Sequence, residues 1–376
     1  MLNVTNYGAA CCVIEGNGLR ILCDPWFTDG IYLGAWEREH YLADPIATIG
    51  KVDYIWISHL HEDHYDPAFL RSYLAAYPET IIWIGFGNHY LGKLLKRDGF
   101  EYDDYSSVSG HGWIVGIIPN HGYPNEIDNI DYALVVVDHD SAVVNMNDNP
   151  FDQKQIDIIN GMTEDRGLHV TALLPYSGAG PWPQCVRMSP HACLMAAGDK
   201  RRKFLTQFQR YKDALHADVA IPFAAGYRLR GPLAELNPYR GIPAPEDVPG
   251  ATVLPVTGAT ERPASDSSGY VWEDAPMPAN EELERLLRQA AERSPKVDGE
   301  PLTIDLNWGT GATYLDATYE PAKTAHETIE LDPRLLHGLL TRRWHWNVAE
   351  IGSVLRINRH KDYDPRVFDF LYRFHT

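Results

Sequence analysis

Apolar residues in the first third of the chain occur in short runs separated by turn residues and by amphipathic stretches. Residues 9–26 contain two such runs, joined at Gly16-Asn17-Gly18, which predicts two strands linked by a hairpin turn. A third run, 52–59, predicts a buried strand. Residues 67–78 follow it with a proline at the first helical position and apolar residues at helical spacing, which predicts a helix. Strands that alternate with helices indicate an α/β fold.

The alternation continues to about residue 226, and the pattern then changes. Further strands are predicted within 80–86, 113–121, 131–138, 141–148, 169–180 and 218–226, and helices within 89–99, 151–162 and 190–217. Residues 238–269 carry six prolines and little periodicity, which indicates a connector or a loop packed over the core. An amphipathic helix at 279–294 and an aromatic-rich tail follow. We expect a core at 1–237, a connector at 238–270 and a mainly helical extension at 271–376 that packs on the core.

Composition narrows the classes of function. Of the 376 residues, 44% are hydrophobic and 22% are charged, which is the range of globular proteins with a large core. The formal net charge of −18 argues against a nucleic-acid partner, which normally requires a basic surface. The sequence predicts neither a signal peptide nor a membrane span, and the five cysteines form no C-x-x-C pair. We therefore expect a cytoplasmic protein without a disulfide framework or a cysteine zinc site.

Four candidate metal ligands lie within six residues, directly after the predicted strand 52–59. They are His59, His61, Asp63 and His64. They can converge only if the loop turns so that the first two histidines face one ion and the Asp-His pair faces another. Imidazole ligands suit zinc, iron, manganese or cobalt, and the adjacent carboxylate can serve a second ion. The spacing therefore predicts a two-metal site in one short loop.

This H-x-H-x-D-H spacing resembles the signature of the metallo-β-lactamase superfamily. The resemblance implies a four-layer αββα sandwich with the motif at the carboxyl end of a strand, here joined to a C-terminal helical extension. It also implies an aspartate after an earlier strand, and Asp24 in ILCDPWF occupies that place. We expect Asp24 to orient ligand side chains without binding the ions itself.

The resemblance implies two further ligands downstream, a histidine and then an aspartate that bridges the ions. His121 and Asp148 follow predicted strands and are our assignments. His111 competes with His121 but precedes its strand, so we expect it at the opposite end of the sheet, together with His139 and Asp140. Asp131 is expected to hold a ligand by a hydrogen bond.

The superfamily's usual seventh ligand, a histidine after the last core strand, is absent. The matching segment, 219–226, reads VAIPFAAG. Without this histidine, one metal ion either has an open coordination position or takes a replacement ligand from elsewhere in the chain. His191, near a predicted helix start, is the nearest candidate for an extra ligand. His345, between two tryptophans, is the other, and we expect it to pack among aromatic rings.

Further segments resemble the CMP-N-acetylneuraminate hydroxylase branch of the superfamily. These are DPWF (24–27), SHLHEDH (58–64), NMNDN (145–149), YSGAGPWP (176–183), IPFAAGY (221–227) and the tail 344–371. The resemblance implies a non-heme diiron monooxygenase that holds two iron ions and uses O2 to hydroxylate a small organic substrate, of natural-product or sugar-nucleotide type.

That branch typically carries a Rieske cluster, but no cysteine here is followed two residues later by histidine. We therefore expect an external electron donor, a ferredoxin or a reductase. The alternative is a dinuclear zinc or manganese hydrolase of an ester, lactone or phosphodiester.

Overall fold

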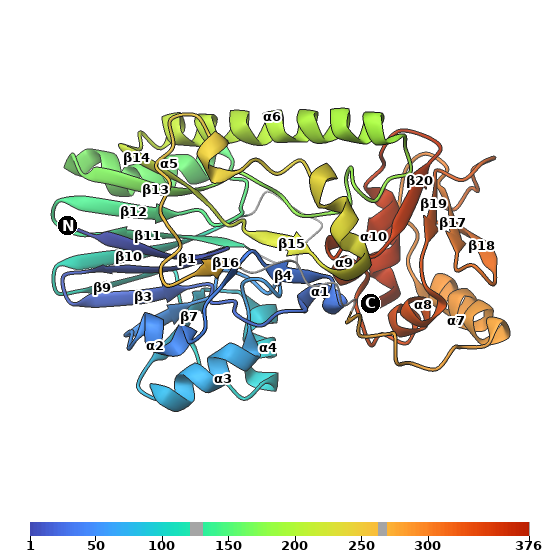
Figure 1. Cartoon of the computed structure of the whole chain (residues 1–376), viewed down its shortest axis with the longest axis horizontal. Helices are drawn as coiled ribbons and strands as arrows, with labels where there is room; N and C mark the ends of the chain where they lie inside the picture. The colour runs from blue at the N-terminus through green and yellow to red at the C-terminus, as the bar shows by residue number, and fades with distance from the viewer. Residues whose placement is uncertain (121–130, 262–268, 376) are drawn as a thin grey trace.

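The computed structural model describes residues 1–120, 131–261 and 269–375, and two six-stranded sheets form its larger part (Figure 1). The first sheet has the order β1-β2-β3-β6-β7-β8 and the second the order β14-β13-β12-β11-β10-β9. In the first sheet the strands are β1 (Asn3–Gly8), β2 (Cys11–Gly16), β3 (Leu19–Cys23), β6 (Tyr54–Trp56), β7 (Ile81–Gly85) and β8 (Asp103–Tyr105). In the second they are β9 (Ser107–Gly110), β10 (Trp113–Pro119), β11 (Tyr132–Val137), β12 (Ser141–Asn145), β13 (His169–Pro175) and β14 (Val219–Phe223).

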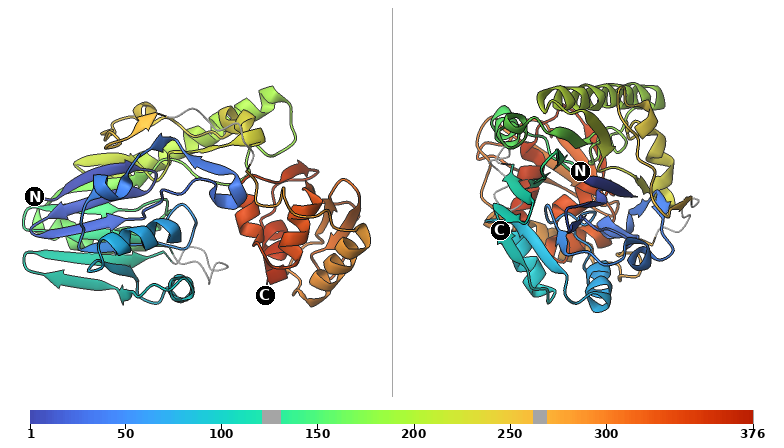
Figure 2. Two further views of the ribbon diagram at one scale, coloured as in Figure 1. Left: turned by 60° about the horizontal axis from the view of Figure 1, so that its bottom comes forward. Right: turned by 90° about the vertical axis from the view of Figure 1, so that its left-hand side faces the viewer.

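Helices cover the outer face of each sheet, as Figures 1 and 2 show. The first sheet carries α2 (Pro45–Ile49), α3 (Pro67–Ala76) and α4 (His89–Arg97), and the second carries α5 (Gln153–Thr163) and α6 (Pro190–Ala214). Three buried apolar clusters fill the spaces between the layers: one between the sheets, including Trp56 and Leu134, and one under each helical layer. The expected four-layer αββα sandwich is therefore confirmed.

Short elements complete this part of the chain. They are α1 (Ile31–Gly34), the pairs β4 (Trp36–Arg38) with β15 (Tyr227–Leu229) and β5 (His40–Tyr41) with β16 (Thr260–Glu261), and the 3-10 turns η1 (Glu164–Arg166), η2 (Gly231–Tyr239) and η3 (Pro245–Asp247). The proline-rich segment lies on the core, since Thr252 N–H donates to Ala220 O and Thr257 N–H to Asn6 O, both at 2.8 Å.

The C-terminal part differs from the mainly helical expectation. It contains α7 (Asn280–Arg293), α8 (Pro333–Leu340), α9 (Trp346–Ile351), α10 (Arg366–Tyr372) and the turn η4 (Arg373–His375). It also contains a four-stranded sheet in the order β18-β17-β19-β20: β17 (Thr303–Asn307), β18 (Ala312–Asp316), β19 (Glu327–Glu330) and β20 (Arg356–Arg359). These strands are four or five residues long, too short for a clear alternation in the sequence. The boundaries 1–237, 238–270 and 271–376 remain predictions.

The turn between β11 and β12 offers a test of stability against pH. Burial raises the pKa of Asp138, but hydrogen bonds accepted from Asp140 N–H, Ser141 N–H and Ser141 Oγ, together with the Met1 ammonium group 3.0 Å away, outweigh it, and the net pKa is lowered. We expect Asp138→Asn to lower the free energy of unfolding by about 1–2 kcal/mol at pH 7. A lowered pKa contributes stability above the ordinary carboxyl pKa of about 4, and this is lost as pH falls through the folded value. In urea unfolding, the difference in the free energy of unfolding between wild type and Asp138→Asn should therefore be smaller at pH 3 than at pH 7. An equal difference at the two pH values would contradict the role assigned to Asp138.

Candidate metal centre

The predicted motif lies at the carboxyl edge of the first sheet, beside Asp24. Strands β3 and β6 are parallel with Cys23 opposite Trp56, so Asp24 and the loop that follows β6 emerge side by side. Asp24 N–H donates to Trp56 O at 2.9 Å. The N–H groups of His64 and Tyr65 both donate to His61 O, at 3.0 and 2.9 Å, which turns the loop back on itself. The expected reversal within the motif is therefore present.

Three of the predicted ligands converge on one point. Candidate ligand atoms of His59, His61 and Asp148 all lie within 4.8 Å of one another, and His59 Nε2 is 2.8 Å from His61 Nδ1. Asp148 follows β12 of the second sheet, so this group joins the carboxyl edges of both sheets. Two imidazoles and a carboxylate are a donor set for a divalent transition metal.

The other two motif residues, Asp63 and His64, also lie close to Asp148 or to each other. His64 Nε2 is 3.5 Å from the Asp63 carboxylate and 3.6 Å from Asp148 Oδ2. The rings of His59 and His64 are 4.0 Å apart. Asp148 therefore contacts both groups, which is the position expected of a carboxylate that bridges two ions.

Outer partners fix the orientation of the histidine rings. Asp24 is fully buried and accepts hydrogen bonds from Ser58 N–H and Ser58 Oγ, both at 2.7 Å, and lies 3.0 Å from His64 Nδ1. Asp131 lies 3.6 Å from His59 Nδ1. Ser58 Oγ lies 2.9 Å from His59 Nδ1 and 3.3 Å from His64 Nδ1. With Nδ1 of each ring on this outer side, Nε2 of each ring faces the interior of the site. Asp24 is within hydrogen-bond distance of His64, whereas Asp131 lies beyond that distance from His59, and their supporting roles remain predictions.

Asp148 is held by the asparagines that surround it in NMNDN. Its N–H donates to Asn147 Oδ1 at 2.6 Å, and Asn147 Nδ2 donates to Tyr132 O at 2.7 Å. Asn147 has a φ of 44°, a left-handed conformation that asparagine adopts more readily than most residues. The side chain of Asn145 accepts from Asn147 N–H at 2.9 Å and fixes this turn.

The charges of the site favour a cation. Burial lowers the pKa of His59 and of His61, which keeps both rings in the neutral form that coordinates metal. Burial also opposes protonation of His64, but the carboxylates of Asp148, Asp63 and Asp24 outweigh it and raise the pKa of His64 well above its usual range. The centre therefore holds more negative charge than its own side chains neutralise.

One observation that does not depend on the sequence motif also supports a metal site at these residues. Asp148 Oδ1 is buried and has no hydrogen-bond partner among the described residues. A buried carboxylate oxygen without a partner is costly, and a bound cation would offset that cost. We therefore treat this group as a candidate metal centre.

The remaining predicted residues have different outcomes. His121 lies outside the described residues. His191 is exposed in the first turn of α6, and its role as an extra ligand remains a prediction. His345 caps α9, with Nδ1 accepting from Asn347 N–H at 3.1 Å, and packs against His375 with ring centroids 4.5 Å apart.

Asn17 Nδ2 contacts both Gly112 O and Asp138, so the turns that carry His111 and His139 lie together at the hairpin end of β2 and β3, opposite Asp24.

Tyr32, which no sequence motif indicates, also belongs to the site. Its hydroxyl donates to Asp63 Oδ1 at 2.6 Å, and its N–H donates to the Glu62 carboxylate. Burial, together with the charge of Asp63, raises the pKa of Tyr32 and keeps the hydroxyl protonated as a donor. Trp36 packs on Tyr32 at 4.4 Å and stacks on Tyr227 at 3.5 Å, forming a buried aromatic wall.

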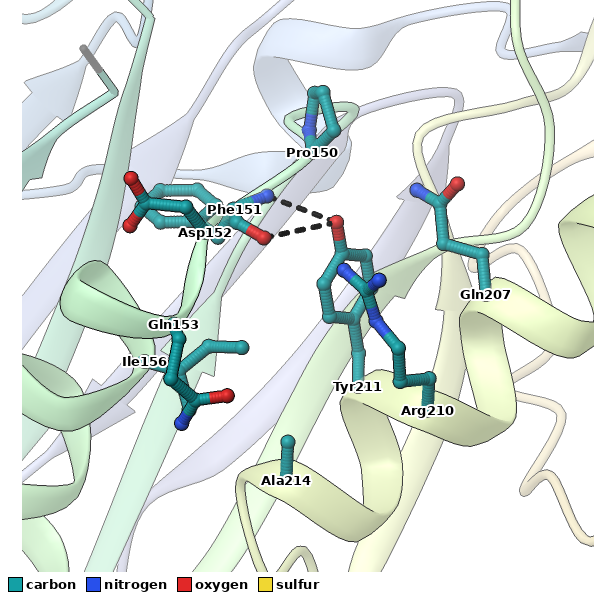
Figure 3. A pocket seen from close by; sticks show the side chains of 9 residues that line it. All are labelled: Pro150, Phe151, Asp152, Gln153, Ile156, Gln207, Arg210, Tyr211 and Ala214. Atoms are coloured by element: carbon teal, nitrogen blue, oxygen red, sulfur yellow. Dashed lines mark hydrogen bonds between the residues drawn. The ribbon is translucent and has the colours of Figure 1, made fainter. Parts of the chain in front are cut away.

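A cavity of about 550 Å³ between α5 and α6 is separate from this centre (Figure 3). Phe151, Gln207, Arg210 and Tyr211 are among the residues that line it, and Tyr211 Oη accepts from Phe151 N–H at 2.9 Å. None of the candidate ligands among the described residues lines it, so we do not assign this cavity to the metal centre.

Comparison with known proteins finds similarity over part of the chain. Residues 3–150 match the family model of the β-lactamase superfamily domain. A Mycolicibacterium smegmatis protein, named as a candidate Rieske 2Fe-2S iron-sulfur protein, is 32% identical over 258 residues, covering 65% of this chain and 47% of that protein. The cytidine monophosphate-N-acetylneuraminic acid hydroxylase of Asterias rubens is 31% identical over 114 residues, covering 30% of this chain and 18% of the hydroxylase. The chain thus spans less than half the length of these curated relatives.

Solved structures align with part of the chain at low identity. An isothiocyanate hydrolase from Delia radicum gut bacteria aligns with a TM-score of 0.44 and 12% identity, covering 69% of this chain and 99% of that chain. CmlA, a diiron β-hydroxylase from Streptomyces venezuelae, aligns with a TM-score of 0.40 and 16% identity, covering 69% of this chain and 53% of that chain. Neither alignment assigns a reaction. Residues 3–150 are thus similar to the β-lactamase superfamily domain, and the curated proteins to which the chain is similar include CMP-N-acetylneuraminic acid hydroxylases.

Proposed function

We propose that the chain is a non-heme diiron monooxygenase that hydroxylates a small organic substrate with O2 and electrons from an external donor, a ferredoxin or a reductase. His59 and His61 would hold one iron ion with His121, Asp63 and His64 would hold the other, and Asp148 would bridge them. Bound iron would supply the redox chemistry that inserts one oxygen atom into a C–H bond.

The observation that carries the proposal is the chemistry of the segment after β14. The carboxyl ends of β12, β13 and β14 meet at one sheet edge, because β13 pairs in parallel with both neighbours. Asp148 follows β12 at this edge, whereas β14 is followed by Ala224 and Ala225, and Ala225 bridges to Ala9. The place where superfamily hydrolases have a histidine is therefore apolar here. Among the described residues, this segment supplies no side chain that could bind an ion, and an open position of that kind would be available to O2.

The names of the relatives support the same reaction class. Two are CMP-N-acetylneuraminic acid hydroxylases, and three are named for a Rieske iron-sulfur cluster, which is an electron-transfer group. The Rieske names support electron transfer to such a centre, and the separate donor is part of the proposal.

The chain's own residues would prepare the site in two ways. Asp24 contacts His64 Nδ1 and Ser58 Oγ contacts His59 Nδ1, which leaves Nε2 of both rings facing inward, so the rings would not need to reorient when a metal binds. The wall formed by Tyr32, Trp36 and Tyr227 is buried and would exclude water from one side of the centre. A dry, rigid centre protects an oxidising reaction from side reactions.

Metal analysis combined with O2 exposure tests the proposal. Protein produced in iron-supplemented medium should contain about two iron ions per chain. After anaerobic chemical reduction, it should develop an O2-dependent absorption change, and His61→Ala should lose at least half of the metal. Stoichiometric zinc or manganese, no O2-dependent change and turnover of generic esters would instead favour the dinuclear hydrolase.

A further inference from the structure

The segment 30–34, which carries Tyr32, has an unusual backbone. Tyr32 and Leu33 have φ values of 50° and 64°, so two consecutive residues that are not glycine adopt the left-handed conformation. L-residues rarely do this, because the Cβ atom then lies too close to the following carbonyl oxygen. Such a conformation persists only where surrounding groups hold it, and it is common at functional sites.

Both parts of the chain hold this segment. On the core side, the Glu62 carboxylate accepts a hydrogen bond from Tyr32 N–H. On the C-terminal side, Val271 N–H donates to Leu33 O at 3.2 Å. Helix α9 lies beside α1 (Figure 1), so close that a Cβ added at Gly352 would lie 3.0 Å from Tyr32 O. The position of Tyr32 is therefore set jointly by the metal-binding motif and by the C-terminal part of the chain.

The hydroxyl of Tyr32 reaches one oxygen of a candidate ligand. It donates to Asp63 Oδ1 at 2.6 Å, the short distance of a hydrogen bond to a charged acceptor. The other oxygen, Asp63 Oδ2, lies 3.5 Å from His64 Nε2. The two oxygens of Asp63 thus differ in their surroundings: Tyr32 holds one, and the other lies beside the ring nitrogen expected to bind an ion.

We propose that Tyr32 is a positioning residue of the metal centre, that it directs Asp63 Oδ2 at the ion shared with His64, and that α9 holds it in place. A carboxylate that can rotate presents either oxygen or both to an ion, whereas a strong donor on Oδ1 leaves Oδ2 as the coordinating atom. Because Tyr32 donates to the second half of the motif, we expect it to act on one of the two ions. This inference rests on the metal centre proposed above, whichever metal it holds.

Co²⁺ binding to the full chain tests the positioning role, with the visible spectrum of bound Co²⁺ as a readout of ligand geometry. Tyr32→Phe removes the hydroxyl but keeps the ring that packs on Trp36. We expect the dissociation constant of one Co²⁺ ion to rise by about 10–100-fold, with a changed spectrum, while that of the other ion stays near the wild-type value. A loss of stability alone would weaken both ions to the same extent.

The matched control is Tyr73→Phe. Tyr73 is a buried tyrosine of α3 whose hydroxyl donates to Gly50 O at 2.6 Å and accepts from Val52 N–H at 3.0 Å. Neither partner is a candidate ligand. The substitution should therefore lower the free energy of unfolding without changing either dissociation constant or the spectrum.

The role of α9 is tested at Gly352. Its φ of −62° suits alanine, but the added Cβ would meet Val348 O at 2.9 Å and Tyr32 O at 3.0 Å. We expect Gly352→Ala to weaken binding of the same Co²⁺ ion by about fivefold or more. Combined with Tyr32→Phe it should add little, because the hydroxyl through which α9 acts is then absent. Gly161→Ala in α5 is the control, since a Cβ there meets nothing within 4 Å.

The positioning role would be overturned by a Tyr32→Phe chain that keeps both wild-type dissociation constants and the wild-type spectrum, or by equal weakening in Tyr73→Phe. The role of α9 would be overturned if Gly352→Ala bound Co²⁺ as Gly161→Ala does, or if its effect were fully additive with that of Tyr32→Phe. If Gly352→Ala does not fold, Ile351→Ala takes its place, because it removes packing against the buried cluster that contains Tyr32. A wild-type chain that binds fewer than two Co²⁺ ions would refute the two-ion centre itself, and so separates the two failures.

Discussion

Replacing Asp148 with alanine is expected to abolish stoichiometric metal binding at both positions. Asp148 converges with His59 and His61 and also lies 3.6 Å from His64 Nε2, so its carboxylate serves both groups. Even an outer hydrogen-bond partner of a metal ligand is worth roughly 10–100-fold in affinity, and a shared ligand should exceed about 100-fold. Metal content after gel filtration, followed by isothermal titration with Zn²⁺, measures the effect.

Asp140→Ala is the matched control for this prediction. Asp140 is an exposed aspartate in the turn between β11 and β12, at the opposite end of β12 from Asp148. It should retain the metal content of the wild type. If Asp148→Ala bound two ions with wild-type affinity, the proposed bridging role would be wrong.

Asp24→Ala is expected to cause the largest loss of stability, about 3–5 kcal/mol in the metal-free chain at pH 7. Burial raises the pKa of Asp24, so this carboxylate is costly to hold and depends on its partners. Its loss leaves Ser58 N–H, Ser58 Oγ and His64 Nδ1 without the acceptor that they share. Unsatisfied buried donors each cost about 1–3 kcal/mol.

Urea unfolding monitored by tryptophan fluorescence measures this loss. Asp53→Ala provides the comparison, because exposed Asp53 accepts one hydrogen bond, from Arg20 N–H at 2.8 Å, near the start of β3. It should cost no more than about 1 kcal/mol. Equal losses in the two variants would show that Asp24 is not the organising residue of the centre.

The hairpin of β2 and β3, the helix α3 and the long helix α6 could all be predicted, because each has a local signal. Gly16-Asn17-Gly18 specifies the turn, and Pro67 and Pro190 mark the first turns of the two helices. The sheet in the C-terminal part could not be predicted in this way. Its strands pair across long separations, as when Ile304 aligns with Glu327 and Glu327 with Arg359.

The sequence by itself determined the candidate donors of the metal centre, because His59, His61, Asp63 and His64 are close enough in the chain for one turn to bring them together. It also indicated Asp24, Asp131 and Asp148 through their places at strand ends. Only the tertiary structure decided that Tyr32 and Ser58 support these donors and that α9, far later in the chain, packs against the cluster that contains Tyr32. Such contacts depend on position in space and not on separation along the sequence.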